Sequence, residues 1–239
     1  MLNKINAQKL LLASLITLAI FPAVILLART GAMHFRNSFL IMIIAAIVAF
    51  IVLVLAVFKM SRAKEGESKS LILTMLCTAT PLVILGNFIA LGQSRPFIHD
   101  ITTDFDTPPE LVAAADLRTP DENPVTYIGG EVMELQMQGY PDLKPLLLNV
   151  NPDEAFAMVE KQVQVEGWEL VAKHKETLPY TVEAVATSLL FGFKDDIAIR
   201  ISRTESGTRI DMRSKSRVGK SDLGANADRI KNFFEALSK

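Results

Sequence analysis

The pattern of apolar and polar positions divides the chain into an apolar N-terminal part and a mixed C-terminal part. Three segments, Leu10–Ala28, Ser38–Phe58 and Leu71–Gly92, contain no Asp, Glu, Lys, Arg or His. Each has about the length of the roughly 20 apolar residues that cross a bilayer, and each lacks the polar stripe of a helix on a soluble core. Because lipid offers the backbone no hydrogen-bond partners, we expect three membrane-spanning helices within residues 1–93.

The basic residues that flank these segments indicate an orientation. The richer flanks are the N-terminal one and the loop between the second and third segments, which contain Lys4, Lys9, Lys59, Arg62, Lys64 and Lys69. The first loop has only Arg29 and Arg36. Since basic flanks favour the cytoplasmic side, we predict a multi-pass cytoplasmic (inner) membrane protein with a cytoplasmic N-terminus. Residues 94–239 are then extracytoplasmic, which in a bacterium means periplasmic. Thr30-Gly31-Ala32 is a poor cleavage site, so the first segment is expected to stay as an anchor.

The stretch 94–150 is rich in proline and acidic residues, a composition that favours extended and turn structure. Because a structureless linker of this length is unusual in a compact domain, we interpret it as an irregular arm packed over the domain. A short helix is expected at Glu110–Leu117.

The remaining sequence predicts an α+β domain. Asn151, Pro152 and the acids after them are typical of a helix start, and Gly167 of its end. Four strand-like segments follow, and a last helix is expected to begin near Ser221 or Asp222, with Ser221 as its N-cap. The strands are Trp168–His174, Tyr180–Phe193, Ile197–Arg203 and Thr208–Val218. This order predicts an antiparallel sheet with helices on one face.

Alternation of isoleucines with polar residues predicts a hairpin around Ser206-Gly207. A two-residue loop there places Arg203 opposite Ile210 and Ile201 opposite Met212, whereas a slip of one residue would mix the two faces. In this register Arg200 lies opposite Arg213, and Asp196 opposite Arg217.

Two guanidinium groups facing each other repel unless a negative group lies between them. We therefore consider an anion or partner site near the N-terminus of the last helix, where backbone N–H groups also attract anions. Its candidate residues are Arg200, Arg213, Lys215, Arg217, Lys220 and Ser221. The alternative is a solvated face whose arginines are neutralised by Glu183, Asp195, Asp196 or acids of the arm.

Four motifs in order resemble the family called domain of unknown function 1499. They are residues 96–104, 140–145, 193–200 and 213–226, which begin with Pro96, Tyr140, Phe193 and Arg213. The resemblance covers about residues 94–238, and bacterial members often carry N-terminal spans. It implies no particular chemistry, because the family has no assigned activity. It does imply that the arginine-rich strand end and the first motif share one functional surface. The further candidates are His99, Asp100, Thr102, Thr103, Asp195 and Asp196.

Composition and motifs argue against most specific chemistries. A net charge of −1 indicates no nucleic-acid partner, and the dispersed His34, His99 and His174 indicate no metal site. Gly219-Lys220-Ser221 lacks the earlier glycine of a phosphate-binding loop, because that position is Ser214. We expect no cofactor.

Three functions remain open. The first is a membrane-tethered extracytoplasmic binding or assembly module that recognises an anionic lipid headgroup or a protein partner. The second is an envelope hydrolase using His99 with Ser214, Ser216 or Ser221. The third is an accessory subunit of a membrane complex.

Overall fold

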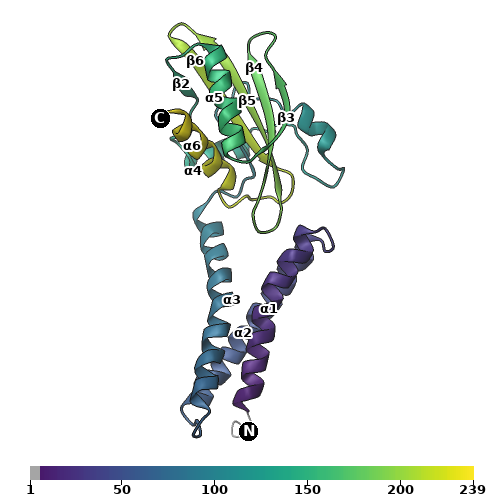
Figure 1. The fold of residues 1–239 in the computed structure, drawn as a ribbon, viewed down its shortest axis with the longest axis vertical. Coiled ribbons are helices and arrows are strands. Elements are labelled where there is room, and N and C mark those ends of the chain that lie inside the picture. Colours follow the sequence, from purple (N-terminus) through teal and green to yellow (C-terminus); the bar gives the residue numbers. More distant parts are fainter. Residues whose placement is uncertain (1–5) are drawn as a thin grey trace. The chain divides into compact units, whose positions relative to one another are not determined.

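The computed structural model describes residues 6–239, which form two compact units. The first consists of the chain up to Leu91 together with Leu189–Gly192, and the second of Gly92–Ser188 with Phe193–Lys239. Figure 1 shows long helices in the first unit and a sheet with shorter helices in the second.

The three predicted apolar helices make up most of the first unit, and the last turn of the third continues into the second unit. They are α1 (Ala7–Arg29), α2 (Phe35–Met60) and α3 (Ser68–Ser94), and each is long and apolar enough to cross a membrane. Pro22 and Pro81 lie within α1 and α3 without ending them. The buried face of α2 is rich in alanine, including Ala45, Ala49 and Ala56, and small residues let neighbouring helices approach closely. Ser38 also donates a hydrogen bond of 3.2 Å to the carbonyl oxygen of Val24 in α1.

The second unit is the predicted α+β domain, built on one antiparallel sheet. The strands run in the order β1-β6-β5-β4-β3, and β2 pairs with another part of β6. Their bounds are β1 (Asp100–Thr102), β2 (Leu146–Leu148), β3 (Glu169–His174), β4 (Tyr180–Thr187), β5 (Lys194–Thr204) and β6 (Gly207–Ser216). The helices are the 3₁₀ helix η2 (Ala113–Leu117), α4 (Glu131–Gly139), α5 (Pro152–Val165) and α6 (Ala225–Leu237).

The apolar face of the sheet carries the core, as the alternation predicted. Ile197, Ile199 and Ile201 of β5 are buried there under α5 and α6 (Figure 1). Asn151 caps α5 by accepting a 3.0 Å hydrogen bond from the Glu154 amide, which confirms the predicted helix start. Trp168 stacks on Phe233 of α6, with ring centroids 5.1 Å apart.

The predicted hairpin register is wrong by two residues. Ile201 pairs with Ile210 and Thr204 with Gly207, so the loop is Glu205-Ser206. A shift of two residues leaves every side chain on the same face, so apolar alternation cannot detect it. The observed register puts Arg200 opposite Asp211 instead of Arg213, which replaces a repulsive pair with an attractive one.

The last helix begins later than predicted, at Ala225, and Ser221 does not cap it. Leu223 and Gly224 have positive φ angles of 56° and 89°, which interrupt the helix before that point. The Asp222 carboxylate accepts hydrogen bonds from the amides of Gly224 (2.8 Å) and Asn226 (2.9 Å). The Ser221 hydroxyl accepts one from the amide of Leu223 at 3.3 Å. A carboxylate therefore already occupies the helix start that we considered for an anion.

Candidate functional site

The polar face of the sheet is covered by the arm and holds a network of buried charges. Asp100 accepts two hydrogen bonds of 2.9 Å from the Arg213 guanidinium, and its Oδ2 lies 2.9 Å from Lys215 Nζ. The arm adds backbone acceptors, because the carbonyls of Val125 and Thr126 lie 2.7 and 2.8 Å from Arg213 and Lys215. Burial lowers the pKa of Lys215, although Asp100 opposes this effect. One carboxylate thus serves two buried cations.

A second carboxylate, Asp196, is shared in the same way. Its oxygens lie 2.7 Å from Arg118 Nε and 2.7 Å from Arg217 Nη2. Arg118 comes from the arm, just after η2, whereas Arg217 directly follows β6. Asp196 is fully buried, so removing its charge would leave two guanidinium groups without a counter-ion.

The third group of charges is balanced, with two arginines and two aspartates. Arg200 Nη2 lies 2.7 Å from Asp104 and 3.1 Å from Asp211. Arg209 Nη2 lies 3.0 Å from Asp104 and 2.8 Å from Asp211. These contacts join the arm, β5 and β6.

The predicted arginine site is therefore not open to an external anion. Arg200, Arg213, Lys215 and Arg217 all contact carboxylates of this domain. The alternative interpretation named Asp196 and acids of the arm as partners, but it expected a solvated face, whereas Arg213, Lys215 and Arg217 are buried. Sequence reasoning missed Asp104 and Arg118 of the arm, and also Arg209, which lies on β6 and contacts both Asp104 and Asp211. Lys220 is exposed on the surface.

Asp195 and the two strand serines lie on the opposite, helix-covered face. Asp195 pairs with Arg229 of α6 at 2.6 Å, and Arg229 also donates to the Ser214 hydroxyl at 2.9 Å. Asn226 lies 2.7 Å from Ser214 and 3.0 Å from Ser216. Both serines are buried in this cluster.

The first motif provides backbone support next to the charge network. Thr103 accepts a 2.9 Å hydrogen bond from the Met212 amide, and the Gln136 side chain bonds both backbone groups of Thr102. His99 lies 3.4 Å from the carbonyl oxygen of Lys220 through Nδ1. Burial, followed by the charge of Lys215, lowers the pKa of His99. Thr102 and Thr103 thus hold the arm on β6.

A serine triad is not assembled in the part of the chain that the structure describes. The Asp100 carboxylate contacts Arg213 and Lys215, where a triad would have it orient His99. Within residues 6–239 no group of three His, Cys, Asp or Glu residues could hold a metal ion.

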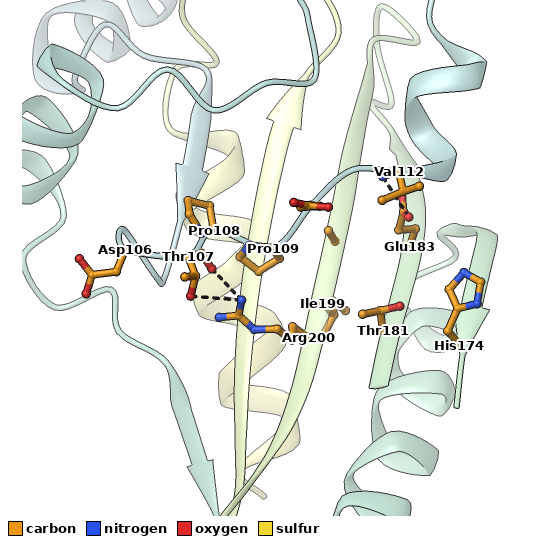
Figure 2. A pocket seen from close by; sticks show the side chains of 12 residues that line it. Asp106, Thr107, Pro108, Pro109, Val112, His174, Thr181, Glu183, Ile199 and Arg200 are labelled. Carbon is orange, nitrogen blue, oxygen red and sulfur yellow. Dashed lines mark hydrogen bonds between the residues drawn. The ribbon is translucent and has the colours of Figure 1, made fainter. Parts of the chain in front are cut away.

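A groove of about 560 Å³ lies beside the charge network, between the arm and strands β3 to β5 (Figure 2). Thr181, Glu183, Ala198 and Arg200 line it from the sheet, and residues 106–110 and 112 of the arm line it from the other side. His174 lies on β3, the edge strand of the sheet.

Two sets of hydrogen bonds to the arm fix the wall of this groove. Arg200 donates a 2.7 Å hydrogen bond to the carbonyl oxygen of Thr107, as Figure 2 shows. Glu183 accepts hydrogen bonds of 3.0 to 3.2 Å from the amides of Val112, Ala113 and Ala114, at the start of η2. The arm is therefore attached to the sheet at both ends of the groove, and the groove lies between these two attachments.

These features define a class: an α+β domain joined to three candidate membrane-spanning helices, with a closed charge network and an adjoining groove. The chain belongs to the family described as "Protein of unknown function (DUF1499)", whose model matches residues 100–237. No curated protein matches the chain.

Proposed function

We propose that the second unit is a non-catalytic binding module, held on the extracytoplasmic side of the inner membrane, which recognises a protein partner through the groove. The observation that carries the proposal is the groove itself, whose walls are fixed by Arg200 and Glu183. A cavity bounded by fixed walls and lined by mixed polar and apolar groups is typical of a binding site.

The charges that remain available favour a basic segment of the partner. Asp106 and Glu110 are exposed on the arm, and neither carboxylate makes an ion pair among the described residues. By contrast, Arg200 already contacts two aspartates. An anionic lipid headgroup is therefore poorly supported as the ligand of this face.

Tethering strengthens such a module. A domain attached to the bilayer by its own spans meets a neighbouring membrane protein at a high effective concentration, so a weak contact suffices. The same argument applies if the protein is an accessory subunit of a larger membrane complex. The hydrolase alternative has no support from the geometry. Ser214 and Ser216 are buried against Asn226 and Arg229, and Ser221 and His99 contact the Leu223 amide and the Lys220 carbonyl.

Site-specific photo-crosslinking of the full chain in its native membrane tests the proposal. A photoreactive phenylalanine analogue at Thr181, which lines the groove, is expected to give an adduct of one discrete mass. The same analogue at Gln164, exposed on α5 and on the opposite side of the sheet, should give none.

A charge reversal makes the experiment specific. Glu110→Lys should abolish the Thr181 adduct, whereas Glu166→Lys at the exposed end of α5 should leave it unchanged. Equal adducts from both photoreactive positions, or an adduct indifferent to Glu110→Lys, would contradict the groove as the binding site. Labelling by a serine-hydrolase probe that one Ser→Ala change removes would favour the hydrolase instead.

A further inference from the structure

The loop between β4 and β5 exposes two adjacent leucines. Its residues, Leu189–Gly192, belong to the first unit, whereas the strands on either side belong to the second. Leu189 is 85% exposed and Leu190 is 52% exposed. A single exposed apolar side chain is normal on a protein surface, but adjacent ones at the tip of a hairpin mark a contact with another apolar medium.

Hydrogen bonds at the base of this leucine loop place it at one end of the sheet. The Ser188 amide donates to the Phe193 carbonyl oxygen at 2.8 Å, and the Phe193 amide donates to the Ser188 hydroxyl at 2.9 Å. The next carbonyl oxygen, that of Lys194, accepts a 3.0 Å hydrogen bond from the amide of Arg217, which directly follows β6. The leucine loop therefore continues the sheet at the end where β6 finishes.

The chain enters the second unit at this same end of the sheet. The His99 carbonyl oxygen accepts a 2.9 Å hydrogen bond from the amide of Ser216, the last residue of β6. Gly92 ends the apolar stretch of α3, and a Cβ atom there would lie 3.7 Å from Leu223, in the segment between β6 and α6. Phe97, which lies between these two points of the entering chain, is 66% exposed. Contacts within the second unit thus attach the exit of the last candidate span to the sheet end that carries the leucine loop.

The hairpin around the leucine loop presents no free carboxylate. Residues 184–197 contain three charged side chains, those of Lys194, Asp195 and Asp196. The two aspartates are buried and pair with arginines of the domain at 2.6 and 2.7 Å. Lys194 is exposed and makes no ion pair among residues 6–239. Leucines flanked by an exposed lysine are typical of a segment in a bilayer interface, because the lysine stem lies along apolar surface while its ammonium group stays with the phosphates.

The opposite end of the sheet has a different character. The loop that joins β5 to β6 there is Glu205-Ser206, and both residues are exposed. The apolar loop thus lies at the end of the sheet that is tethered to a candidate span, and the polar loop lies at the free end.

We propose that the leucine loop inserts into the interface of the bilayer that surrounds the candidate spans. Leu189 and Leu190 enter the boundary between headgroups and acyl chains, about 5–10 Å deep, and Lys194 remains among the phosphate groups. Two side chains suffice for this contact, because the tether already keeps the loop at a high effective concentration beside the lipid. The loop gives the domain a second point of attachment besides α3, which fixes the direction in which the sheet points. The inference does not rest on the function proposed for the groove.

Quenching of a fluorescent label by lipid tests the inference on the full chain in liposomes. Cys77, the only cysteine, is first changed by Cys77→Ala, and an NBD fluorophore is then attached to Leu189→Cys or to Leu147→Cys. Leu147 is a matched control, because it is 69% exposed and pairs with Arg209 near the start of β6, at the free end of the sheet. Phospholipids with a nitroxide on the acyl chain should quench the label at position 189 at least about threefold more than the label at position 147.

A charged substitution beside the label makes the test specific. Leu190→Asp should reduce quenching of the label at position 189 at least about twofold, whereas Leu147→Asp in the same labelled chain should leave it unchanged. Equal quenching at positions 189 and 147 would overturn the insertion of the loop, and so would quenching at position 189 that is indifferent to Leu190→Asp. Before labelling, Trp168 fluorescence verifies that each variant is folded, since this only tryptophan reports on packing against α6.

Discussion

At the scale of single residues, two buried carboxylates of the domain each contact two buried cations. Asp100 serves Arg213 and Lys215, and Asp196 serves Arg118 and Arg217. A buried ion pair gains little over an apolar pair, but a buried charge that loses its counter-ion is strongly destabilising. The effect of a substitution here therefore depends on which partner is removed.

Removal of Asp100 is expected to be far more damaging than removal of Lys215. Asp100→Asn leaves two buried cations without a counter-ion and should lower the free energy of unfolding by about 3–5 kcal/mol. Lys215→Met leaves the Arg213–Asp100 pair intact, so we expect a loss of about 1 kcal/mol or less. Urea unfolding of the full chain in detergent, followed by Trp168 fluorescence, measures both changes.

The exposed pair of Asp153 and Lys175 serves as the control for these substitutions. It has a contact of 3.0 Å but mostly exposed side chains, so Asp153→Asn should change stability by less than about 1 kcal/mol. Equal losses for Asp100→Asn and Lys215→Met would show that the shared carboxylate is not the centre of the network.

Lys215 also predicts a pH dependence with a definite sign. Burial holds its pKa below the ordinary value of 10.5 in the folded domain. Between that lowered pKa and 10.5 the unfolded chain binds more protons, so the contribution of Lys215 to stability rises with pH. The difference in unfolding free energy between wild type and Lys215→Met should therefore increase from pH 7 to pH 10.

The pH range for this measurement ends near pH 10 because the neighbouring Tyr127 also affects stability above that pH. Burial raises the pKa of Tyr127 to about 12, so above its ordinary value of about 10 the folded state binds more protons and stability falls. If the difference in unfolding free energy between wild type and Lys215→Met stays constant or decreases between pH 7 and pH 10, the pH dependence does not come from Lys215.

At the scale of secondary-structure elements, the predictable features are those with a local signal. Asn151 and Pro152 place the start of α5, and the isoleucines of β5 identify the buried face of the sheet. The short strands β1 and β2 have three residues each, which is too few for a periodic pattern. The ion pairs of Asp104 and Arg118 join positions far apart in the sequence, so no local pattern reveals them.

The hairpin register shows the same limit and leads to a prediction at Gly207. This residue has a φ angle of 143°, and a Cβ there would lie 2.2 Å from the carbonyl oxygen of Leu148 in β2. Gly207→Ala must therefore strain the backbone and push β2 away from β6, and we expect a loss of about 3 kcal/mol or more. The loss should appear as a lower urea midpoint.

Gly167 offers a matched control for this prediction. Its φ angle of 68° is also positive, but nothing lies within 4 Å of an added Cβ. Gly167→Ala should lower the free energy of unfolding by only about 1–2 kcal/mol, the ordinary penalty of the left-handed region. Similar losses at both glycines would mean that β2 does not restrict the hairpin.

At the scale of the whole molecule, the two units have opposite designs. The helices of the first unit expose large apolar side chains such as Leu12, Leu40 and Phe50, which is unfavourable in water and expected in lipid. The second unit instead buries its isoleucines and covers even its polar sheet face with the arm. The proposal for the groove requires this second unit to be held at a membrane surface.

The basic residues that flank the spans predict the side of the membrane on which the second unit lies. Lys59, Arg62, Lys64 and Lys69 bracket the α2–α3 connection, whereas the α1–α2 connection has only Arg29 and Arg36 at its ends. Basic residues resist translocation, so the α2–α3 connection should be cytoplasmic and Lys239 extracytoplasmic. A reporter enzyme that is active only outside the cytoplasm should work when fused after Lys239 and fail when inserted at Glu65. The reverse result would place the groove and its free carboxylates in the cytosol, and would rule out an envelope partner.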